Sequence, residues 1–323
     1  MAVSYEFSIG SVRAKETALF KPADIEQLLV CKDEGELCAT LADKGYTDAA
    51  GTDEMLEKHT DEMWAYLRGV APDMSIFDPF ILQNDAHNFK VVLKGTMADR
   101  EYRSLMIEPC VTAHEELIDA VERRQMYRLP EWMQKPCDRA YELLAHTGDA
   151  RMADAVLDKA VMREMLRLSR GYNSAFLKKY FETLVFYSNI KTALRAAHTG
   201  TDRDYMHNAL CDVEGFRRKE IAAAAVKGFD ALLGLLSKCS EYDCKTAVER
   251  FKESPSAFER FTDDMLITLA RECCKRTSEG AEPLLGYYLG VEAEKKVIHI
   301  IAGGIRTNTE PDIIRERLRE IYG

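Results

Sequence analysis

The sequence predicts an all-α fold, in which the protein is built almost entirely of helices. Apolar residues recur three and four positions apart along most of the 323 residues, which is the spacing of one face of a helix. Strictly alternating apolar and polar runs, which indicate β-strands, are scarce. The nine prolines are few for this length, and several stand where a helix would begin or stop.

Proline marks the start of three predicted helices. Because proline lacks a backbone N–H and has a fixed φ, it fits the first turn of a helix and disrupts later turns. Pro22 precedes ADIEQLL, Pro130 precedes EWM and Pro311 precedes DIIRERLREIY. The apolar stripes of two predicted helices are Ile25, Leu28 and Leu29, and Ala153, Val156 and Leu157.

Two helix ends are predicted by the same four letters, AHTG, at residues 145–148 and 197–200. A glycine just past the last helical turn adopts the left-handed conformation of a cap without strain. A histidine in that turn suits the negative end of the helix dipole. We therefore expect Gly148 and Gly200 to cap helices, and we favour this over a chemical role for His146 and His198.

One helix is written twice, with its polar and apolar residues in the same places. The segments DAHNFKVVLKG at 85–95 and FYSNIKTALRA at 186–196 are related by a shift of 101 residues. Their apolar stripes, at i, i+3 and i+4, are Phe89, Val92 and Leu93, and Ile190, Ala193 and Leu194. Their repeated polar residues are Asn88, Lys90 and Lys94, and Asn189, Lys191 and Arg195.

A third and weaker copy follows after a further 108 residues, in EKKVIHIIAGG. Val297 stands in place of the asparagine and His299 in place of the lysine. The positions that keep the pattern are Ile298, Ile301 and Ala302 in the stripe, and Gly304, which corresponds to Gly95. Chance likeness between amphipathic helices is the alternative explanation, and it weighs most on this copy.

Three copies at a spacing of about one small domain predict a triplicated helical unit. Each unit would hold about a hundred residues. The boundaries that we expect are 1–105, 106–207 and 208–323, for three similar helical domains.

Composition narrows the classes of function. The formal net charge of −10 at pH 7 disfavours binding to nucleic-acid phosphates or anionic lipids. The nine cysteines are an odd number, and Cys273 and Cys274 are adjacent, so we expect buried free thiols and no disulfide framework. The start of the chain lacks the features of a secretory signal, and the nearest approach to a membrane span, residues 297–305, is too short. We expect a cytosolic protein.

The usual motifs of catalysis are missing from the sequence. It has no GxxxxGK[ST] loop for phosphate, no GxGxxG after a strand, and no HExxH, since His114 is followed by EELI. The pairs Cys31 and Cys38, and Cys239 and Cys244, lack the close partner sets of a structural zinc site, so we expect core thiols. We therefore expect no catalytic residue, no cofactor and no metal.

The repeated polar residues have two interpretations each. The lysine and arginine side chains could meet acidic groups of a partner. Alternatively they could be solvated or paired with neighbours such as Asp85, and we favour this second interpretation. The asparagines could hold neighbouring helices by side-chain hydrogen bonds. The segment at 123–133, RRQMYRLPEWM, has the composition of an interface but could equally be a partly covered helix junction. The candidates for packing or partner contact are Asn88, Lys90, Lys94, Asn189, Lys191, Arg195 and His299.

Several segments in a fixed order carry a family resemblance. They are YEFSIGSVRAKETALFKPADIEQLL with Arg13, Ala14 and Glu16, then LADKGY ending at Tyr46, DAHNFKVVLKG, and PLLGYYLGVEAEKKVIHIIAGG from Pro283. With these segments the chain resembles, over essentially its whole length, the family of C subunits of V-type and archaeal-type ATP synthases and ATPases, which is similar to the d subunit of the eukaryotic proton pump. The last helix departs from the family pattern of Asn followed by Arg, because this chain has Val297 and His299 there.

The resemblance implies a funnel-like, all-helical body of three similar domains around a pseudo-threefold axis, without catalytic activity of its own. In the family this protein belongs to the central stalk at the cytoplasmic face of the membrane. It sits on the proteolipid ring and receives the foot of the central shaft, so that it couples the catalytic sector to rotary proton or sodium transport. The implied partners are the central-shaft subunits and the proteolipid ring, with no nucleic acid and no direct membrane span.

Two other classes of function stay open from the residues alone. A free-standing helical scaffold of the solenoid type would have repeats of about 30 to 45 residues, whereas the period here is near a hundred. An enzyme with a histidine or thiol centre would reveal itself by a stoichiometric ion or a reactive thiol. The sequence does not show whether ATP is made or consumed, or which ion is moved.

Overall fold

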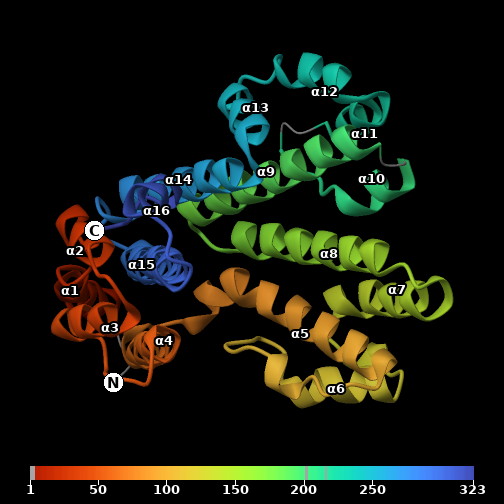
Figure 1. Ribbon diagram of the computed structural model, residues 1–323. Helices are drawn as coiled ribbons and strands as arrows, with labels where there is room; N and C mark the ends of the chain where they lie inside the picture. Colours follow the sequence, from red (N-terminus) through yellow and green to blue (C-terminus); the bar gives the residue numbers. More distant parts are fainter. Residues whose placement is uncertain (1–3, 201–202, 215–216) are drawn as a thin grey trace. The chain divides into compact units, whose positions relative to one another are not determined.

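The computed structural model describes residues 4–200, 203–214 and 217–323, and these form α-helices and short 3-10 helices with no β-strand (Figure 1). The predicted all-α fold is confirmed. The chain divides into two compact units, of which unit 1 is Met1–Ser75 with Arg250–Gly323 and unit 2 is Ile76–Glu249. The division into three repeats stays a prediction.

Unit 1 is arranged around its longest helix. Its helices are α1 (Tyr5–Glu16), α2 (Pro22–Leu29), α3 (Glu34–Asp43), α4 (Thr52–Val70), α14 (Pro255–Cys274), α15 (Glu282–Arg306) and α16 (Pro311–Arg317). Helix α15 packs against all six of the others. Sixteen of its 25 residues are buried, among them every residue from 283 to 291, as expected for a helix at the centre of a core.

Two glycines let other parts of unit 1 approach α15 closely. A Cβ atom built on Gly286 would lie 2.7 Å from the Cβ atom of Cys274 in α14. A Cβ atom on Gly290 would lie 2.7 Å from Leu19 and 3.3 Å from Tyr322 near the end of the chain. Contacts this short are not tolerated by larger side chains, so the two glycines allow dense packing here.

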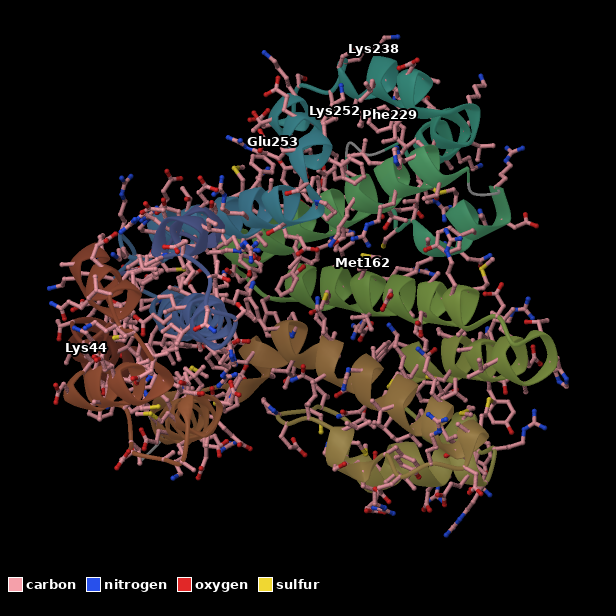
Figure 2. The ribbon with its side chains drawn as sticks, viewed as in Figure 1. Lys44, Met162, Phe229, Lys238, Lys252 and Glu253 are labelled. Atoms are coloured by element: carbon pink, nitrogen blue, oxygen red, sulfur yellow. The ribbon has the colours of Figure 1, made fainter. Side chains whose placement is uncertain are left out.

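The edge of unit 1 is held by charge as well as by apolar contact. Lys44, which is labelled in Figure 2, ends α3, and its Nζ atom donates to Oδ1 of Asp24 in the first turn of α2 at 2.6 Å. The same ammonium group lies 5.9 Å from the centroid of the Phe20 ring. This contact fastens the C-terminus of α3 to the N-terminus of α2.

Unit 2 is a succession of helices, of which α8 and α9 each pack against several others. Helix α8 packs against α5, α7, α9 and α10, and α9 packs against α8, α10, α11 and α12 (Figure 1). The elements that lie in unit 2 or, at its two ends, span its boundaries are η1 (Met74–Phe77), α5 (Asp78–Ala98), η2 (Arg103–Leu105), α6 (His114–Glu122), η3 (Met126–Arg128), α7 (Glu131–Thr147), α8 (Ala150–Gly171), α9 (Ala175–Thr199), α10 (Arg203–Ala209), α11 (Arg218–Lys227), α12 (Phe229–Leu236) and α13 (Cys244–Glu253).

The predicted helix starts and stops are confirmed. Pro22 and Pro311 are the first residues of α2 and α16, and Pro130 caps the N-terminus of α7. Gly148 and Gly200 follow the last turns of α7 and α9 with φ angles of 66° and 72°, in the left-handed region. Their N–H groups donate to the carbonyl oxygens of residues 144 and 196, which satisfies the helix ends.

The nine cysteines are all free thiols, as expected, but the expectation that they are buried holds for only four of them. The core positions are Cys137, Cys211, Cys244 and Cys274. Cys31, Cys38, Cys110, Cys239 and Cys273 are partly exposed, and of these Cys31, Cys110 and Cys239 lie in connecting segments beyond the ends of helices. Within the described ranges, no helix is both long enough and apolar enough to cross a bilayer.

Candidate functional site

The apolar stripes of the three related helices are buried at every position. None of the nine side chains is more than 1% exposed, so these faces of α5, α9 and α15 contribute to the cores of their own units. The residues are Phe89, Val92, Leu93, Ile190, Ala193, Leu194, Ile298, Ile301 and Ala302.

Asn88 and Asn189 make the same pair of hydrogen bonds at corresponding places. Nδ2 of Asn88 donates to the carbonyl of Ile107 at 2.9 Å, and its Oδ1 accepts from the N–H of Ile107 at 2.8 Å. Nδ2 of Asn189 donates to the carbonyl of Cys211, and its Oδ1 accepts from the N–H of Cys211, both at 2.9 Å. Each side-chain amide therefore supplies the hydrogen-bond partners of one backbone N–H and one backbone carbonyl in a segment that follows the helix.

A small residue follows at the same place in all three helices. A Cβ atom on Gly95 would meet the side chain of Tyr102 at 2.6 Å, and one on Gly304 would meet Ile314 at 2.5 Å. The second copy has the buried Ala196 there. In the first and third copies the segment after the helix folds back onto the helix end, which only a small residue permits.

Two buried carboxyl groups also occupy corresponding positions, in the first and third copies. Asp85 accepts hydrogen bonds from the N–H groups of Val111 at 2.8 Å and Thr112 at 3.1 Å, and burial raises its pKa to about 6. Glu294 accepts from the N–H of Phe20 at 2.5 Å and from the hydroxyl of Tyr46 at 3.4 Å, and burial raises its pKa to about 8. Each carboxyl fixes a connecting segment against its helix.

The two lysines of the first copy, Lys90 and Lys94, form a basic row on α5 whose members are paired with acidic residues of unit 2. Lys90 forms an ion pair with Asp158, and Nζ of Lys94 lies 2.9 Å from the carboxylate of Asp154. The two acids are four residues apart on α8, so they form a row that matches the lysines. The expected pairing with Asp85 is wrong, because Asp85 is fully buried and its oxygens are engaged by backbone groups.

The basic positions of the other two copies differ from the first in their surroundings. Lys191 is half-buried on α9, and Arg195, one turn further on, is exposed. His299 on α15 has Nδ1 3.6 Å from Oδ1 of Asp53, and burial lowers the pKa of this histidine. Asp53 also pairs with Arg306 at 2.9 Å. His299 thus belongs to unit 1, and the other six candidate residues lie in unit 2 on α5 and α9, two helices that each pack against α8.

The segment at 123–133 lies where three elements of unit 2 meet. The short helix η3 packs against α6 and α7, and Met126 and Met133 are buried between them. Trp132 lies partly buried against this core, whereas Tyr127 is 71% exposed. The segment is a helix junction, and its use as a contact surface stays a prediction.

The chain matches one family of known proteins over nearly all of its length. A sequence profile of the family described as ATP synthase (C/AC39) subunit matches residues 8–317. The chain belongs to this family. The resemblance expected from the sequence is thereby confirmed, and it extends over both compact units.

The relatives within the family are distant but match over most of their length. The C subunit of the V-type sodium ATPase of Enterococcus hirae is 20% identical over 269 residues, which cover 83% of this chain and 81% of the relative. The C subunit of the A-type ATP synthase of Methanocaldococcus jannaschii is 19% identical, with 97% of this chain and 86% of the relative covered. Its counterpart in Haloferax volcanii is 23% identical, with 97% of each chain covered.

We expect the Asn189→Ala variant to lose about 2 to 3 kcal/mol of the unfolding free energy of unit 2, because the buried N–H and carbonyl of Cys211 would lose their partner. Urea denaturation followed by the fluorescence of Trp132 measures this. Asn208→Ala is the matched control, since Asn208 bonds only a carbonyl of its own helix in the described contacts. A cost no larger than that of the control would refute the packing role of Asn189.

Proposed function

We propose that this chain is the non-catalytic central-stalk component of a V-type or archaeal-type ATP synthase or ATPase. In this role it lies between the central shaft of the catalytic sector and the proteolipid ring, at the cytoplasmic face of the membrane. It couples the rotation of the shaft to the transport of protons or sodium ions. Its partners are then the central-shaft subunits and the proteolipid ring.

The family match over residues 8–317 carries this proposal. The relatives are named as the C subunits of V-type and A-type ATPases and ATP synthases, and the alignments cover at least 75% of each relative. A protein that transmits torque must resist deformation, and the buried stripes and the asparagine anchors of α5 and α9 contribute to this stiffness.

The threefold repeat is part of the same proposal. Anchoring asparagines recur in the first and second copies, and buried carboxyls and tightly covered glycines recur in the first and third. Each pair of copies thus shares details beyond the apolar stripe. This supports descent from one helical module, and not a chance likeness between amphipathic helices. The expected domains remain residues 1–105, 106–207 and 208–323.

A binding experiment with the purified full-length chain tests the proposed role. We expect it to bind both the central-shaft subunits and the detergent-solubilised proteolipid ring, through two separate surfaces of more than about 1,000 Å² each. Binding is measured by pull-down and by the stoichiometry of the eluted complex. A chain with native circular dichroism that binds neither partner would refute the proposal.

We expect the charge reversal Arg195→Glu to leave the affinity for the shaft within about threefold, because most of the basic row serves helix packing and solvation. The ion pairs of Lys90 and Lys94 with α8 support this. Lys135→Glu on the exposed face of α7 makes the same change in charge and is the control. A loss of more than about tenfold for Arg195→Glu alone would assign this residue to the shaft interface.

A further inference from the structure

The loop between α5 and α6, together with the first residue of α6, brings together side chains of three kinds that bind metals. Glu108, Cys110 and His114 each contribute one potential ligand atom, and these atoms all lie within 4.8 Å of one another. Oε1 of Glu108 is 3.3 Å from Nε2 of His114, and Oε2 of the same carboxylate is 3.3 Å from Sγ of Cys110. The carboxylate therefore lies between the thiol and the imidazole.

The distances between these ligand atoms are close to those around a metal ion with tetrahedral coordination. Zinc binds sulfur at about 2.3 Å and nitrogen or oxygen at about 2.0 to 2.2 Å, so ligand atoms around it lie about 3.3 to 3.8 Å apart. The two contacts of Glu108 reach this range, one through each oxygen of the carboxylate. The remaining pair, Cys110 and His114, needs to close by about 1 Å at most.

The loop that carries the ligands is fixed to α5 by side chains that are not ligands themselves. Three polar positions on one side of α5 bond the loop backbone between residues 107 and 112, on both sides of Glu108 and of Cys110. They are Asn88 with Ile107, Asn84 with the carbonyl of Pro109 at 2.8 Å, and Asp85 with Val111 and Thr112. A site with ordered backbone loses little entropy when an ion enters, so the ligands are preorganised.

Oxygen acceptors outnumber donors around Nε2 of His114. Nε2 of His114 has two oxygen acceptors near it, the carbonyl of Ile107 at 3.2 Å and the carboxylate of Glu108 at 3.3 Å. The amide Nδ2 of Asn88 is a single donor at 3.2 Å. Two acceptors facing one ring nitrogen require a proton or a cation between them. A metal ion can take that place.

We propose that Glu108, Cys110 and His114 bind one divalent transition-metal ion, with zinc as the ion that fits best. A thiolate, an imidazole and a carboxylate form a ligand set for a borderline-soft ion, whereas magnesium and calcium prefer oxygen alone. The side chain of Glu108 is 66% exposed and that of His114 is 27% exposed, so an ion can enter from solvent. The fourth position is left for water or for a group of a partner.

The metal would act on the surface around it. The same loop presents Leu105, Ile107 and Val111, which are 59%, 40% and 46% exposed, and binding of three side chains within seven residues would hold this apolar surface in one conformation. This inference does not depend on the proposed role in a rotary complex. It holds for the isolated chain.

Cobalt substitution of the full-length chain tests the site. We expect Co²⁺ to produce a thiolate-to-metal charge-transfer band that saturates at one equivalent, and Zn²⁺ to displace it. Cys110→Ser is expected to remove the band. Glu108→Gln and His114→Gln are expected to weaken zinc binding at least about tenfold in competition with a chromogenic chelator.

Cys31→Ser is the matched control, because Cys31 is also a partly exposed thiol in a loop, and it should leave the band unchanged. The thermal transition of each variant without metal must match that of the parent chain. Zinc should then raise the melting temperature of the parent and of Cys31→Ser, but not of Cys110→Ser. Absence of a band at one equivalent, or a band that survives Cys110→Ser, would overturn the proposal.

Discussion

The Phe89→Ala variant is expected to lose about 3 to 5 kcal/mol of the unfolding free energy of unit 2. Phe89 is fully buried in a cluster to which α5, α6, α7 and α8 all contribute. Removing the ring takes away its apolar burial and leaves a cavity where four helices meet, and a rigid cluster of this kind can relax only in part.

The two tryptophans allow this loss to be assigned to one unit. Trp132 lies in unit 2 and Trp64 lies in unit 1, so a Trp64→Phe background reports the unfolding of unit 2 alone. Tyr127→Ala is the control, since Tyr127 is 71% exposed and its truncation should cost no more than about 0.5 kcal/mol. If Phe89→Ala costs as little as the control, the stripe of α5 is not the packing face described above.

The second large effect is expected for the unfolding free energy of unit 1, to which the buried carboxyl of Glu294 makes a contribution that depends on pH. Burial raises the pKa of this carboxyl from 4.5 to about 8, so the folded state holds a proton that the unfolded chain releases. The contribution of Glu294 to stability is therefore complete below about pH 4.5 and is lost as pH rises to about 8. The shift corresponds to roughly 3 to 5 kcal/mol between about pH 4.5 and about pH 9.

Replacement by glutamine removes this dependence while it keeps an acceptor for the N–H of Phe20. We expect the unfolding free energy of Glu294→Gln to exceed that of the parent by several kcal/mol more at about pH 9 than at about pH 4.5. Urea denaturation followed by Trp64 in a Trp132→Phe background measures the difference. Burial raises the pKa of Tyr46 and Tyr287 above the range from about pH 4.5 to about pH 9, and an ion-paired hydrogen bond from Lys44 lowers the pKa of Asp24, so these neighbours keep their charge state across the comparison.

Glu292→Gln serves as the control for the same helix, because Glu292 pairs with Lys295 near the surface of unit 1. This variant should keep the pH dependence of the parent. Equal slopes for the parent and Glu294→Gln between about pH 5 and about pH 8 would show that the buried carboxyl does not govern the stability of unit 1.

The sequence predicted the helical fold and several helix ends because local physical chemistry decides these features. The spacing of apolar residues identified the buried stripes of α5, α9 and α15, and the conformational freedom of glycine identified the caps at Gly148 and Gly200. Asn88 and Asn189 make side-chain hydrogen bonds to the backbone of connecting segments, and not to neighbouring helices as the sequence had suggested.

Other features could not be predicted because they depend on contacts between distant segments. The partners of Lys90 and Lys94 lie 68 and 60 residues further along the chain, on α8, so the nearby Asp85 was the wrong choice. The spacing Glu-x-Cys-x-x-x-His at 108–114 is visible in the sequence, but a search for metal sites that looks for paired cysteines does not find it. Only the folded loop shows that the three side chains converge.

Unit 1 is built from the two ends of the chain, and this has a consequence for the order in which it can fold during synthesis. Its first helices leave the ribosome early, but α15, against which they pack, follows the whole of Ile76–Glu249. Unit 2 is continuous and can complete its core on the nascent chain, whereas the surfaces of α1 to α4 that pack against α15 stay uncovered until synthesis is nearly finished. The part of the protein that is translated first therefore completes its native contacts last.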